Sequence, residues 1–495
     1  MAVERCTFAI VGGGIAGVSC AETLSALCPD EKVLLVTATD LVKAVTNYQK
    51  LSRTLETFDV EEKPSSTLET GCPNVQVHKS TATSLDAVRH ELNCADGLTV
   101  KYDKLCICSG GRPKVISNGN KHVIGIRDTE SVKVFQQRLT TARRIVVVGN
   151  GGIATELVYE IEGCEVVWAI KDKSIASTFI DAGAAEFFLP QLNQEKTDNT
   201  GPVKRLKYMQ EGNTGHKDSK PRTDERPHGG ALGPDWASSR QMTGAAQVCH
   251  SIHVEYSVEV DQVLDEIQMK TAGYSATQPF NTLSLDSTDS WPVYVRLTNG
   301  KVYGCDFIIS ATGVVPNTQP FVGDNLLSVS ADGGIEVNSC METSATDVYA
   351  AGDVCTASWE HSKHWFQMRL WSQARQMGCY AGQSMAAAIR GEKITLDFCF
   401  ELFAHITKFF NYKVVLLGKF NAQGLGPGYE LLLRVTEGEE YVKVIIQDGC
   451  MKGAILIGET DLEETFENLI LNGMDLTPFK EHLLDPNIDI DDFFD

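Results

Sequence analysis

The sequence predicts an α/β protein with two Rossmann-like dinucleotide-binding domains and a small α+β domain at the C-terminal end. Three observations carry this prediction. A glycine-rich turn joins an apolar strand to a helical pattern near residue 12, a second such turn lies near residue 149, and short apolar stretches separated by tight turns fill residues 400–473. Strand–turn–helix units are typical of parallel sheets that bind nucleotides, whereas closely spaced strands with tight turns favour an antiparallel sheet.

The first turn has the spacing G-x-G-x-x-G, in which Gly12, Gly14 and Gly17 follow the apolar run 8–11. The first glycine of this motif permits a tight turn, the second lets a pyrophosphate approach the backbone, and the third lets helix and strand pack closely. The helix N-terminus adds unpaired N–H groups and a positive dipole end. The acid that usually holds the ribose is replaced by Thr37, so we expect Thr37 or a main-chain contact there.

The second turn has the spacing G-x-G-x-x-A, in which Gly149, Gly151 and Ala154 follow an apolar strand. Either turn alone is compatible with an ordinary strand–helix connection. Two of them in the same context argue for dinucleotide binding. The acid expected after the next strand is replaced by Ile170, and Lys171 follows it. A lysine there suits the extra phosphate of NADP, so the choice between NADH and NADPH stays open.

Length and charge define the broad class. The 495 residues exceed one ordinary core and indicate two or three domains. The formal net charge of −21 argues against binding to nucleic acid or to an anionic membrane surface. No apolar run approaches the ~20 residues of a membrane span, and the first strand begins too close to Met1 for a targeting peptide. We therefore expect an intracellular protein without direct nucleic-acid or membrane contacts.

Fifteen cysteines are scattered along the chain without any C-x-x-C pair. An odd number without regular spacing favours neither a disulfide framework nor a zinc site, and we predict no metal. Cys106 and Cys108 lie two apart in an apolar strand pattern, which predicts two buried free thiols on one face. Residues 194–247 are polar and lack periodicity, which indicates a long insertion rather than a domain; a nuclear-import or partner patch is the less common alternative.

Two later motifs point to a family. Residues 305–317 form an apolar strand that ends in A-T-G-x-x-P-N, and a second strand ends in Ala-Gly-Asp353. With the two glycine turns in this order, the set resembles the pyridine nucleotide-disulfide oxidoreductase family of flavoproteins. The resemblance implies an FAD-binding domain at residues 1–128 and 295–393, and an inserted NAD(P)H-binding domain at residues 129–294 that carries the insertion. Residues 394–495 resemble the C-terminal domain of nitrite-reductase-like members and end in an acidic tail.

The resemblance also implies site residues. For FAD these are Gly12, Gly14, Gly17, Thr37, Lys43, Ser109, Gly110, Asp353, Gln373 and Ala374. For NAD(P)H as the hydride donor they are Gly149, Gly151, Ala154, Glu156 and Lys171. The helix that begins at Trp371 is expected to face the flavin pyrimidine, where its dipole stabilises negative charge on the reduced ring.

One departure from the family changes the expected reaction. The chain has neither the C-x(4)-C pair after the second strand nor a C-x-x-C pair, the position of a single redox cysteine falls near Ala44, and His405 lacks the glutamate of an acid/base pair. We therefore expect an FAD-dependent oxidoreductase that takes hydride from NAD(P)H and passes electrons to a non-disulfide acceptor, with dioxygen as a candidate. The alternative is a redox-sensing, NAD(P)H- and FAD-dependent binding module with little turnover.

A narrower resemblance within the family concerns the expected setting. Residues 48–52 resemble a segment of nitrite reductase flavoprotein subunits and rubredoxin reductases. The Val314–Asn317 segment, the Trp371 helix and the tail resemble one vertebrate member. That resemblance implies a role in the oxidative-stress response, protection of the tRNA-splicing ligase complex, and residence in cytoplasm and nucleus. The acidic tail is expected either to fold back or to dock a partner.

Overall fold

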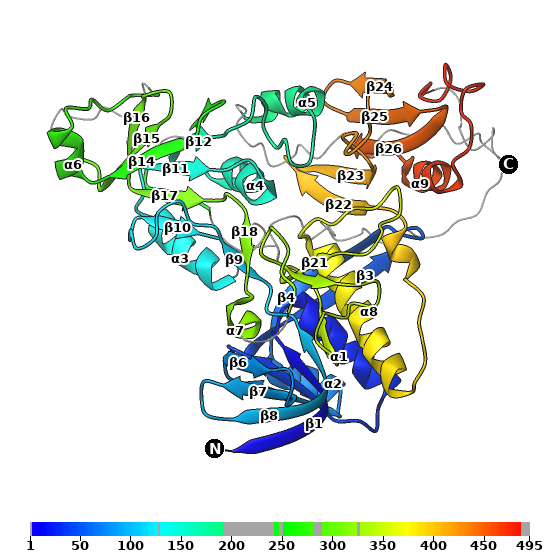
Figure 1. Ribbon diagram of the computed structural model, residues 1–495. Helices are drawn as coiled ribbons and strands as arrows, with labels where there is room; N and C mark the ends of the chain where they lie inside the picture. The colour runs from blue at the N-terminus through cyan, green and yellow to red at the C-terminus, as the bar shows by residue number, and fades with distance from the viewer. Residues whose placement is uncertain are drawn as a thin grey trace, which may run out of the picture.

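The computed structural model describes residues 2–126, 129–192, 242–246, 251–280, 290–323 and 327–486. Most of the predicted insertion and the tail from residue 487 lie outside these residues, so both interpretations stay predictions. Strands of the three largest sheets are labelled in Figure 1. Two of these sheets are mainly parallel and carry the glycine turns, and the third is antiparallel and lies toward the C-terminal end. The predicted fold class is confirmed.

The first sheet holds the first glycine turn. Its parallel strands run in the order β5-β2-β1-β8, and β20 pairs with the second half of β8. The bounds are β1 (Val3–Val11), β2 (Val33–Thr37), β5 (Val75–Lys79), β8 (Thr99–Ile107) and β20 (Val348–Ala350). Strand β2 is buried along its whole length, as expected for a parallel sheet covered on both faces. Helices α1 (Ile15–Leu27) and α8 (Trp371–Ile389) pack side by side against this sheet (Figure 1).

The second sheet holds the second glycine turn, and its five parallel strands run in the order β10-β17-β11-β12-β13. The bounds are β10 (Val123–Gly125), β11 (Arg144–Val148), β12 (Glu165–Ala169), β13 (Ser251–Glu255) and β17 (Phe307–Ser310). Helices α3 (Thr129–Leu139), α4 (Gly152–Glu160) and α5 (Ala182–Leu192) belong to this unit. An antiparallel meander of β14 (Val260–Leu264), β15 (Val293–Leu297) and β16 (Val302–Cys305) follows, with α6 (Glu266–Thr271) between its first two strands.

The strand pairing differs from the predicted boundaries at 128/129 and 294/295. Strands β10, β16 and β17 pair within the second unit and its meander, although the sequence prediction gave them to the first, and β15 spans the predicted boundary at 294/295. The A-T-G motif follows β17, which pairs with β11. It therefore closes the second sheet, and the chain returns to the first unit only through the short antiparallel pair of β18 (Val314–Pro316) and β9 (Gly111–Pro113).

Smaller elements complete the first unit. They are β6 (Ala82–Asp86) and β7 (Glu91–Cys94), which extend the first sheet, α2 (Ser65–Gly71), α7 (Gln319–Val322), and the parallel pair of β19 (Ile335–Val337) and β21 (Cys355–Ala357). Residues 43–52 lie mostly in a hairpin of β3 (Leu41–Lys50) and β4 (Glu56–Pro64), where the sequence analysis predicted no strand. Its side chains are largely exposed or half-buried, so it lacked the apolar alternation that predicts a strand.

The third sheet has the strand order β22-β23-β26-β25-β24 and is antiparallel throughout. The bounds are β22 (Ala404–Phe409), β23 (Tyr412–Gly418), β24 (Glu430–Thr436), β25 (Glu440–Gln447) and β26 (Cys450–Ile457). Helix α9 (Glu463–Asn472) follows them, and a 3₁₀ turn (Phe398–Phe400) precedes them. The antiparallel sheet predicted for residues 400–473 is confirmed.

The third sheet is tied to both other units. Its aromatic side chains share one apolar core with the second unit, where the rings of Phe188 and Phe410 stack at 4.9 Å. On the other side, the buried carboxylate of Glu467 on α9 accepts hydrogen bonds from the hairpin tip. The donors are Thr54 N at 3.2 Å and the hydroxyls of Thr54 and Ser52. The C-terminal unit therefore joins two parts that the sequence alone treats as separate.

A buried carboxylate fastens the β14–β16 meander to the second sheet. Glu255, at the end of β13, accepts hydrogen bonds from Lys301 Nζ at 2.6 Å and Tyr303 Oη at 2.5 Å, and contacts His253 Nε2 at 2.7 Å. Burial alone would raise the pKa of Glu255, but the hydrogen bonds from Lys301, Tyr303 and His253 outweigh it and lower the pKa to about 2.

We expect Glu255→Gln to lower the free energy of unfolding by about 2 kcal/mol at pH 7, because the buried Tyr303 hydroxyl and the Lys301 ammonium lose a charged acceptor. A carboxylate with a lowered folded-state pKa contributes stability above its unfolded pKa, and this contribution is lost as pH falls toward the folded value. The difference in unfolding free energy between wild type and variant should therefore decrease as the pH falls from 5 to 3. Urea unfolding at several pH values measures it, with the exposed Glu259→Gln as the control; a pH-independent gap would contradict this explanation.

Candidate functional site

The first glycine turn lies against the end of β8. Gly12 has φ +114°, and a Cβ there would lie 2.2 Å from the carbonyl oxygen of Cys108; a Cβ on Gly17 would lie 1.9 Å from the carbonyl oxygen of Gly12. Both positions therefore require glycine because backbone approaches backbone. Gly14 differs, since a Cβ there would meet nothing within 4 Å. Backbone atoms therefore fill the space beside Gly12 and Gly17, whereas the space beside Gly14 is empty.

The N-terminus of α1 lies at this open side of the turn. Gly14 is the N-cap, is extended, and offers no side-chain cap to the first-turn amides. An uncapped helix N-terminus with room beside it suits a phosphate. Thr37 ends β2 next to the turn, where its Oγ1 would lie 2.6 Å from a Cβ on Gly13. The first turn therefore fits a dinucleotide, with a hydroxyl where a carboxylate is usual.

The second glycine turn repeats this design. Gly149 has φ +129°, and a Cβ there would lie 2.1 Å from the carbonyl oxygen of Ala311, at the end of β17. Gly151 is the extended, uncapped N-cap of α4, and a Cβ there would meet nothing within 4 Å. Ala154 is fully buried in the first turns of α4. The second turn is thus equally built for a pyrophosphate.

Asn150, between the two glycines, organises the loop after β12. Its Oδ1 accepts the amide of Ala176 at 2.6 Å, and its Nδ2 lies 2.8 Å from Asp172 Oδ2 and 2.9 Å from Ser177 Oγ. Sequence reasoning missed this residue; an asparagine inside a glycine motif was the available signal. The Asp172 carboxylate is thereby held by the protein. Lys171 beside it is exposed, and Glu156 lies half-buried on α4.

A reciprocal pair of hydrogen bonds joins the two parallel units. Ser109 Oγ donates to the carbonyl of Asn317 at 2.8 Å, and Asn317 Nδ2 donates to the carbonyl of Ser109 at 3.0 Å. The amide of Asn317 also donates to the carbonyl of Gly110 at 2.9 Å. The last residue of the A-T-G-x-x-P-N motif therefore fixes the predicted FAD loop at Ser109–Gly110, and this explains why an asparagine is needed there.

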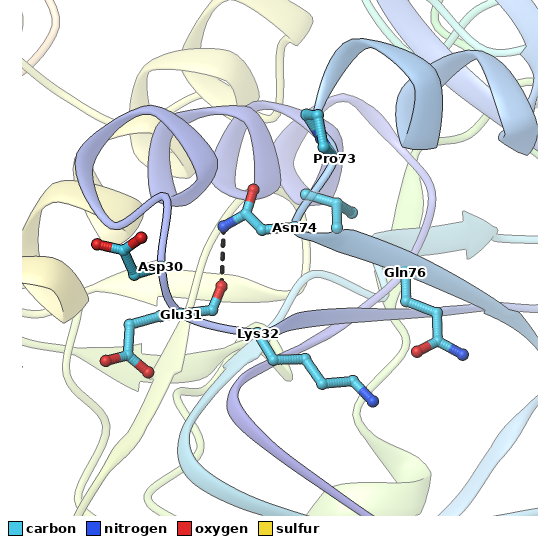
Figure 2. Close-up of a pocket in the computed structure, with 7 residues that line it drawn as sticks. Asp30, Glu31, Lys32, Pro73, Asn74 and Gln76 are labelled. Atoms are coloured by element: carbon cyan, nitrogen blue, oxygen red, sulfur yellow. Dashed lines mark hydrogen bonds between the residues drawn. The ribbon is translucent and has the colours of Figure 1, made fainter.

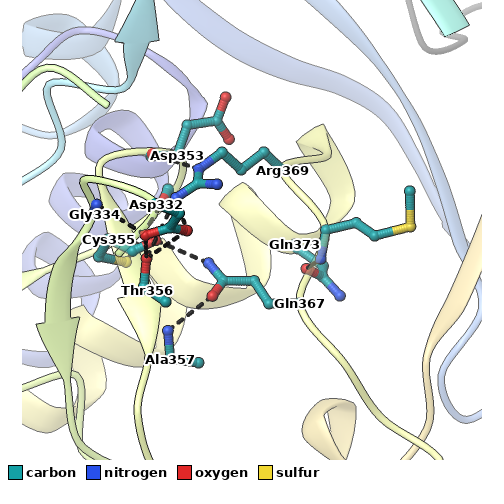
Figure 3. Close-up of polar contacts among 11 residues, drawn as sticks. Asp332, Gly334, Asp353, Cys355, Thr356, Ala357, Gln367, Arg369 and Gln373 are labelled. Carbon is teal, nitrogen blue, oxygen red and sulfur yellow. Dashed lines mark hydrogen bonds and ion pairs between the residues drawn. The ribbon is translucent and has the colours of Figure 1, made fainter. Parts of the chain in front are cut away.

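A polar network holds the turn that carries Asp353 (Figure 3). Arg369 Nε donates to the main-chain carbonyl of Asp353 at 2.9 Å, and Arg369 Nη2 pairs with Asp332 Oδ2 at 2.7 Å. Thr356 and the amide of Gly334 donate to the same carboxylate. Burial would raise the pKa of Asp332, but these hydrogen bonds and the Arg369 charge lower it. Figure 3 shows the Asp353 carboxylate directed away from this network.

Arg369 and Asp332 were missed by the sequence analysis, since their roles depend on residues far apart in the chain. Arg369 directly precedes the N-cap of α8, so it connects the Asp353 turn to that helix. We expect Arg369→Leu to weaken FAD binding about tenfold, because both elements lose their common support. Fluorescence titration of apoprotein with FAD measures this. Arg390→Leu, at the exposed other end of α8, is the control, and equal affinities for the two variants would contradict the assignment.

The start of α8 lies beside the first glycine turn. A Cβ on Gly352 would lie 2.9 Å from Ala16 Cβ and 3.6 Å from Ala374 Cβ, so α1, the Asp353 turn and α8 meet there. Lys43 joins them, since its amide donates to the carbonyl of Gly13 and its Nζ lies 5.4 Å from the centre of the Trp371 ring. The structure thus brings Gly14, Lys43, Asp353 and Ala374 together, as the site prediction requires.

The Gln373 side chain makes its hydrogen bonds within the protein. Its Oε1 accepts the amide of Met368 at 2.8 Å, and its Nε2 donates to the carbonyl of Phe366 at 3.0 Å. It therefore orders the loop before α8. A contact between Gln373 and FAD stays a prediction, and it would fall to the main chain.

Among the described residues, β3 beside the first glycine turn carries no cysteine, whereas the thiols of Cys106 and Cys108 lie at the end of β8. All described cysteines are free. The Sγ atoms of Cys106, on β8, and of Cys108, directly after β8, lie 3.5 Å apart, and both residues are buried as predicted. Cys355 follows the Asp353 turn, and burial raises the pKa of its thiol. Within the described ranges, no three His, Cys, Asp or Glu side chains gather as a metal would require, and no helix is long and apolar enough to cross a membrane.

A depression of about 300 Å³ lies elsewhere, at the amino ends of β2 and β5 (Figure 2). Asn74 spans it, donating to the carbonyls of Glu31 at 2.8 Å and Cys28 at 3.0 Å. Ligands of parallel α/β sheets bind at the carboxyl ends of the strands, so this depression does not belong to the nucleotide site.

Each of the two parallel sheets carries a glycine turn followed by an uncapped helix, and the Asp353 turn lies beside the first of these glycine turns. This arrangement defines a flavoprotein reductase of the two-dinucleotide type. Residues 7–196 and 282–378 match the pyridine nucleotide-disulphide oxidoreductase family, and residues 404–474 match the rubredoxin NAD+ reductase C-terminal domain. The chain belongs to the pyridine nucleotide-disulphide oxidoreductase family. Its cofactor is FAD, with NAD(P)H as the hydride donor, and its class is the NAD(P)H-dependent flavin oxidoreductases.

Full-length relatives support the assignment. The pyridine nucleotide-disulfide oxidoreductase domain-containing protein 1 of Danio rerio is 56% identical over 493 residues, covering 99% of this chain and 98% of the relative. Among solved structures, a ferredoxin reductase from Rhodopseudomonas palustris has a TM-score of 0.66 at 16% identity and covers 98% of this chain and 99% of its own. An engineered water-forming NADPH oxidase reaches 0.64 at 17% identity, with coverage of 98% and 95%. These two structures show the shared fold.

Proposed function

We propose that this protein takes hydride from NAD(P)H onto FAD and passes the electrons to an acceptor other than a protein disulfide. One observation carries the proposal. The site has both glycine turns and the Asp353 turn, yet β3, which runs past the first glycine turn, carries Lys43 and Ala44 and no cysteine. These features support hydride transfer from NAD(P)H to FAD without a thiol relay from this strand.

Bound FAD supplies the two-electron chemistry, and the protein supplies orientation and electrostatics. Gly14 and Gly151 leave room for the two pyrophosphates, and the start of α8 directs a positive dipole end toward the site. Lys43 adds a cation beside Trp371. These groups favour negative charge in the site, which is the charge that hydride transfer brings.

Dioxygen is the simplest acceptor that this arrangement allows. In the balanced reaction, NAD(P)H, one proton and dioxygen give NAD(P)+ and hydrogen peroxide, with two electrons passing through FAD. Structures of the same fold include a ferredoxin reductase and an NADPH oxidase, whose names describe acceptors other than a disulfide. An electron-accepting protein is the alternative to dioxygen, and the experiment below distinguishes the two.

Anaerobic stopped-flow mixing with NADPH or NADH tests the proposal. We expect the flavin absorbance near 450 nm to bleach, and to return on exposure to air with release of hydrogen peroxide. A flavin that stays oxidised would overturn the proposal. A flavin that is reduced but reoxidises slowly in air would exclude dioxygen and direct the search to a protein acceptor.

We further propose that NADPH is accommodated at Lys171. Ile170 is fully buried where a ribose-binding acid is usual, and the Asp172 carboxylate is engaged by the Asn150 amide, which leaves the exposed Lys171 to meet a 2′-phosphate. We expect Lys171→Glu to lower kcat/KM for NADPH about tenfold relative to NADH, through loss of a charge-assisted contact and added repulsion. Steady-state kinetics with both nucleotides measure this, and the exposed Lys121→Glu is the control. An unchanged NADPH/NADH ratio would contradict the proposal.

The second candidate function is a redox-sensing binding module with little turnover. One observation favours it: the third sheet shares a core with the second unit and holds the hairpin tip of the first unit through Glu467, so the C-terminal unit contacts both units that carry glycine turns. Its proposed partner is the tRNA-splicing ligase complex, protected from oxidation in cytoplasm and nucleus. Binding of that complex that requires NADPH, with negligible turnover, would favour this function; binding that is indifferent to NADPH would contradict it.

A further inference from the structure

Ser372 and His405 form an isolated buried pair behind the site. Ser372 lies in the first turn of α8, and His405 lies on β22 of the C-terminal unit. Ser372 Oγ is 3.3 Å from His405 Nδ1, and both residues are more than nine-tenths buried. His405 Nε2 has no hydrogen-bond partner among the described residues. The pair therefore connects the third sheet to the helix that starts beside the Asp353 turn.

The surroundings fix the protonation of His405. Burial is the cause that lowers the pKa of His405, to about 4, so the imidazole is neutral at pH 7 and carries one N–H. A proton on Nε2 would leave a buried donor without an acceptor, which costs more than leaving a lone pair unused. The proton therefore belongs on Nδ1, and His405 donates to Ser372 Oγ. The serine oxygen then serves as acceptor, and its own hydrogen needs another acceptor.

No second protein partner of the Ser372 hydroxyl occurs in the described parts of the chain. The first turn of α8 starts next to the Asp353 turn, and Gly352 lies against both Ala16 and Ala374. The N-terminal end of α8 is thus the end that lies beside the predicted FAD-binding turn. An O–H donor kept free at that place is suited to an acceptor oxygen of the cofactor.

We propose that Ser372 donates a hydrogen bond to a carbonyl oxygen of the FAD ring, and that His405 is a positioning residue that keeps the serine hydroxyl in its donor role. This rests on the proposed function, since it assigns the ring to the start of α8. Reduction places negative charge on the ring, and hydrogen bonds to charged acceptors are stronger than those to neutral ones. The Ser372 hydrogen bond therefore stabilises reduced FAD more than oxidised FAD.

The test compares binding of oxidised and reduced FAD. We expect Ser372→Ala to weaken binding of oxidised FAD about threefold and of reduced FAD about thirtyfold. The tenfold difference lowers the two-electron midpoint potential by about 30 mV. Equilibration with a redox dye and chemical reductant measures the potential without nicotinamide. Ser384→Ala is the matched control, since Ser384 is a buried serine farther along the same helix.

Variants of His405 separate positioning from simple packing. His405→Leu should lower the potential in the same direction, because the hydroxyl loses the group that fixes its orientation. His405→Asn, whose amide donates from nearly the place of Nδ1, should restore it. An Asn variant as impaired as the Leu variant would overturn the role of His405.

Three further outcomes are informative. A potential for Ser372→Ala equal to that of Ser384→Ala would overturn the Ser372 assignment. Equal losses of oxidised and reduced FAD would overturn the ring as its target and favour a phosphate or ribityl oxygen. Failure of NADPH to reduce the wild-type flavin, with the Ser372 potential shift intact, would contradict the proposed function but leave this inference standing.

Discussion

Gly14→Val should weaken FAD binding at least a hundredfold while leaving the apoprotein folded. A side chain at Gly14 meets no protein atom within 4 Å, and the residue is extended, so the fold tolerates it. The same side chain fills the space beside the uncapped first turn of α1. Losing two hydrogen bonds to a charged phosphate costs about 3–6 kcal/mol, which corresponds to a hundredfold or more in Kd.

Fluorescence titration of the apoprotein with FAD measures this affinity, and urea unfolding should differ from wild type by about 1 kcal/mol or less. Gly71→Val is the control, because Gly71 also has open space around its Cβ position but lies on α2. If Gly71→Val lowers FAD affinity as much, the open space at Gly14 is not the pyrophosphate site.

Gly151→Val should strongly slow reduction by NADPH while FAD stays bound. Gly151 is the uncapped N-cap of α4 with open space around it, so a valine displaces ligand rather than protein. We expect the rate of flavin reduction by NADPH to fall at least about a hundredfold, by the same loss of contacts to a charged phosphate. Stopped-flow absorbance measures the rate, and reduction by dithionite confirms that the flavin is still present and active.

The two valine variants check each other. Gly14→Val removes the flavin, whereas Gly151→Val keeps the flavin and removes its donor. An apoprotein from Gly151→Val would reverse the assignment of the two turns. Normal reduction by NADPH in that variant would place the nucleotide elsewhere.

The sequence predicted the fold class well because its signals are local. The spacing of Gly12, Gly14 and Gly17 and that of Gly149, Gly151 and Ala154 depend on neighbours a few residues apart, and the apolar strand before each turn shows directly in the sequence. The structure gives the physical reason for the spacing. At each turn the first glycine packs against a carbonyl and the second faces open space.

The unit boundaries were predicted less well. The family resemblance assigned residues 295–393, which include strand β17, to the first unit. The register of β17 with β11 places this strand in the second sheet. Pairing between strands more than 150 residues apart leaves no local pattern, because any buried apolar strand satisfies either partner. The hairpin of β3 and β4 was missed for the opposite reason, since its exposed strands lack apolar alternation.

The sequence by itself determined the two glycine turns, the cofactor classes implied by the family, and the absence of a cysteine pair in the family's positions. Only the tertiary structure decided which groups support the site. Arg369 reaches the carbonyl of Asp353, Asn317 fixes Ser109, and His405 meets Ser372 across two units. Each of these contacts joins residues of common types that lie far apart in the chain, so no sequence periodicity indicates that they meet. Their meaning arises from burial, where a polar group must find a partner and the fold decides which one.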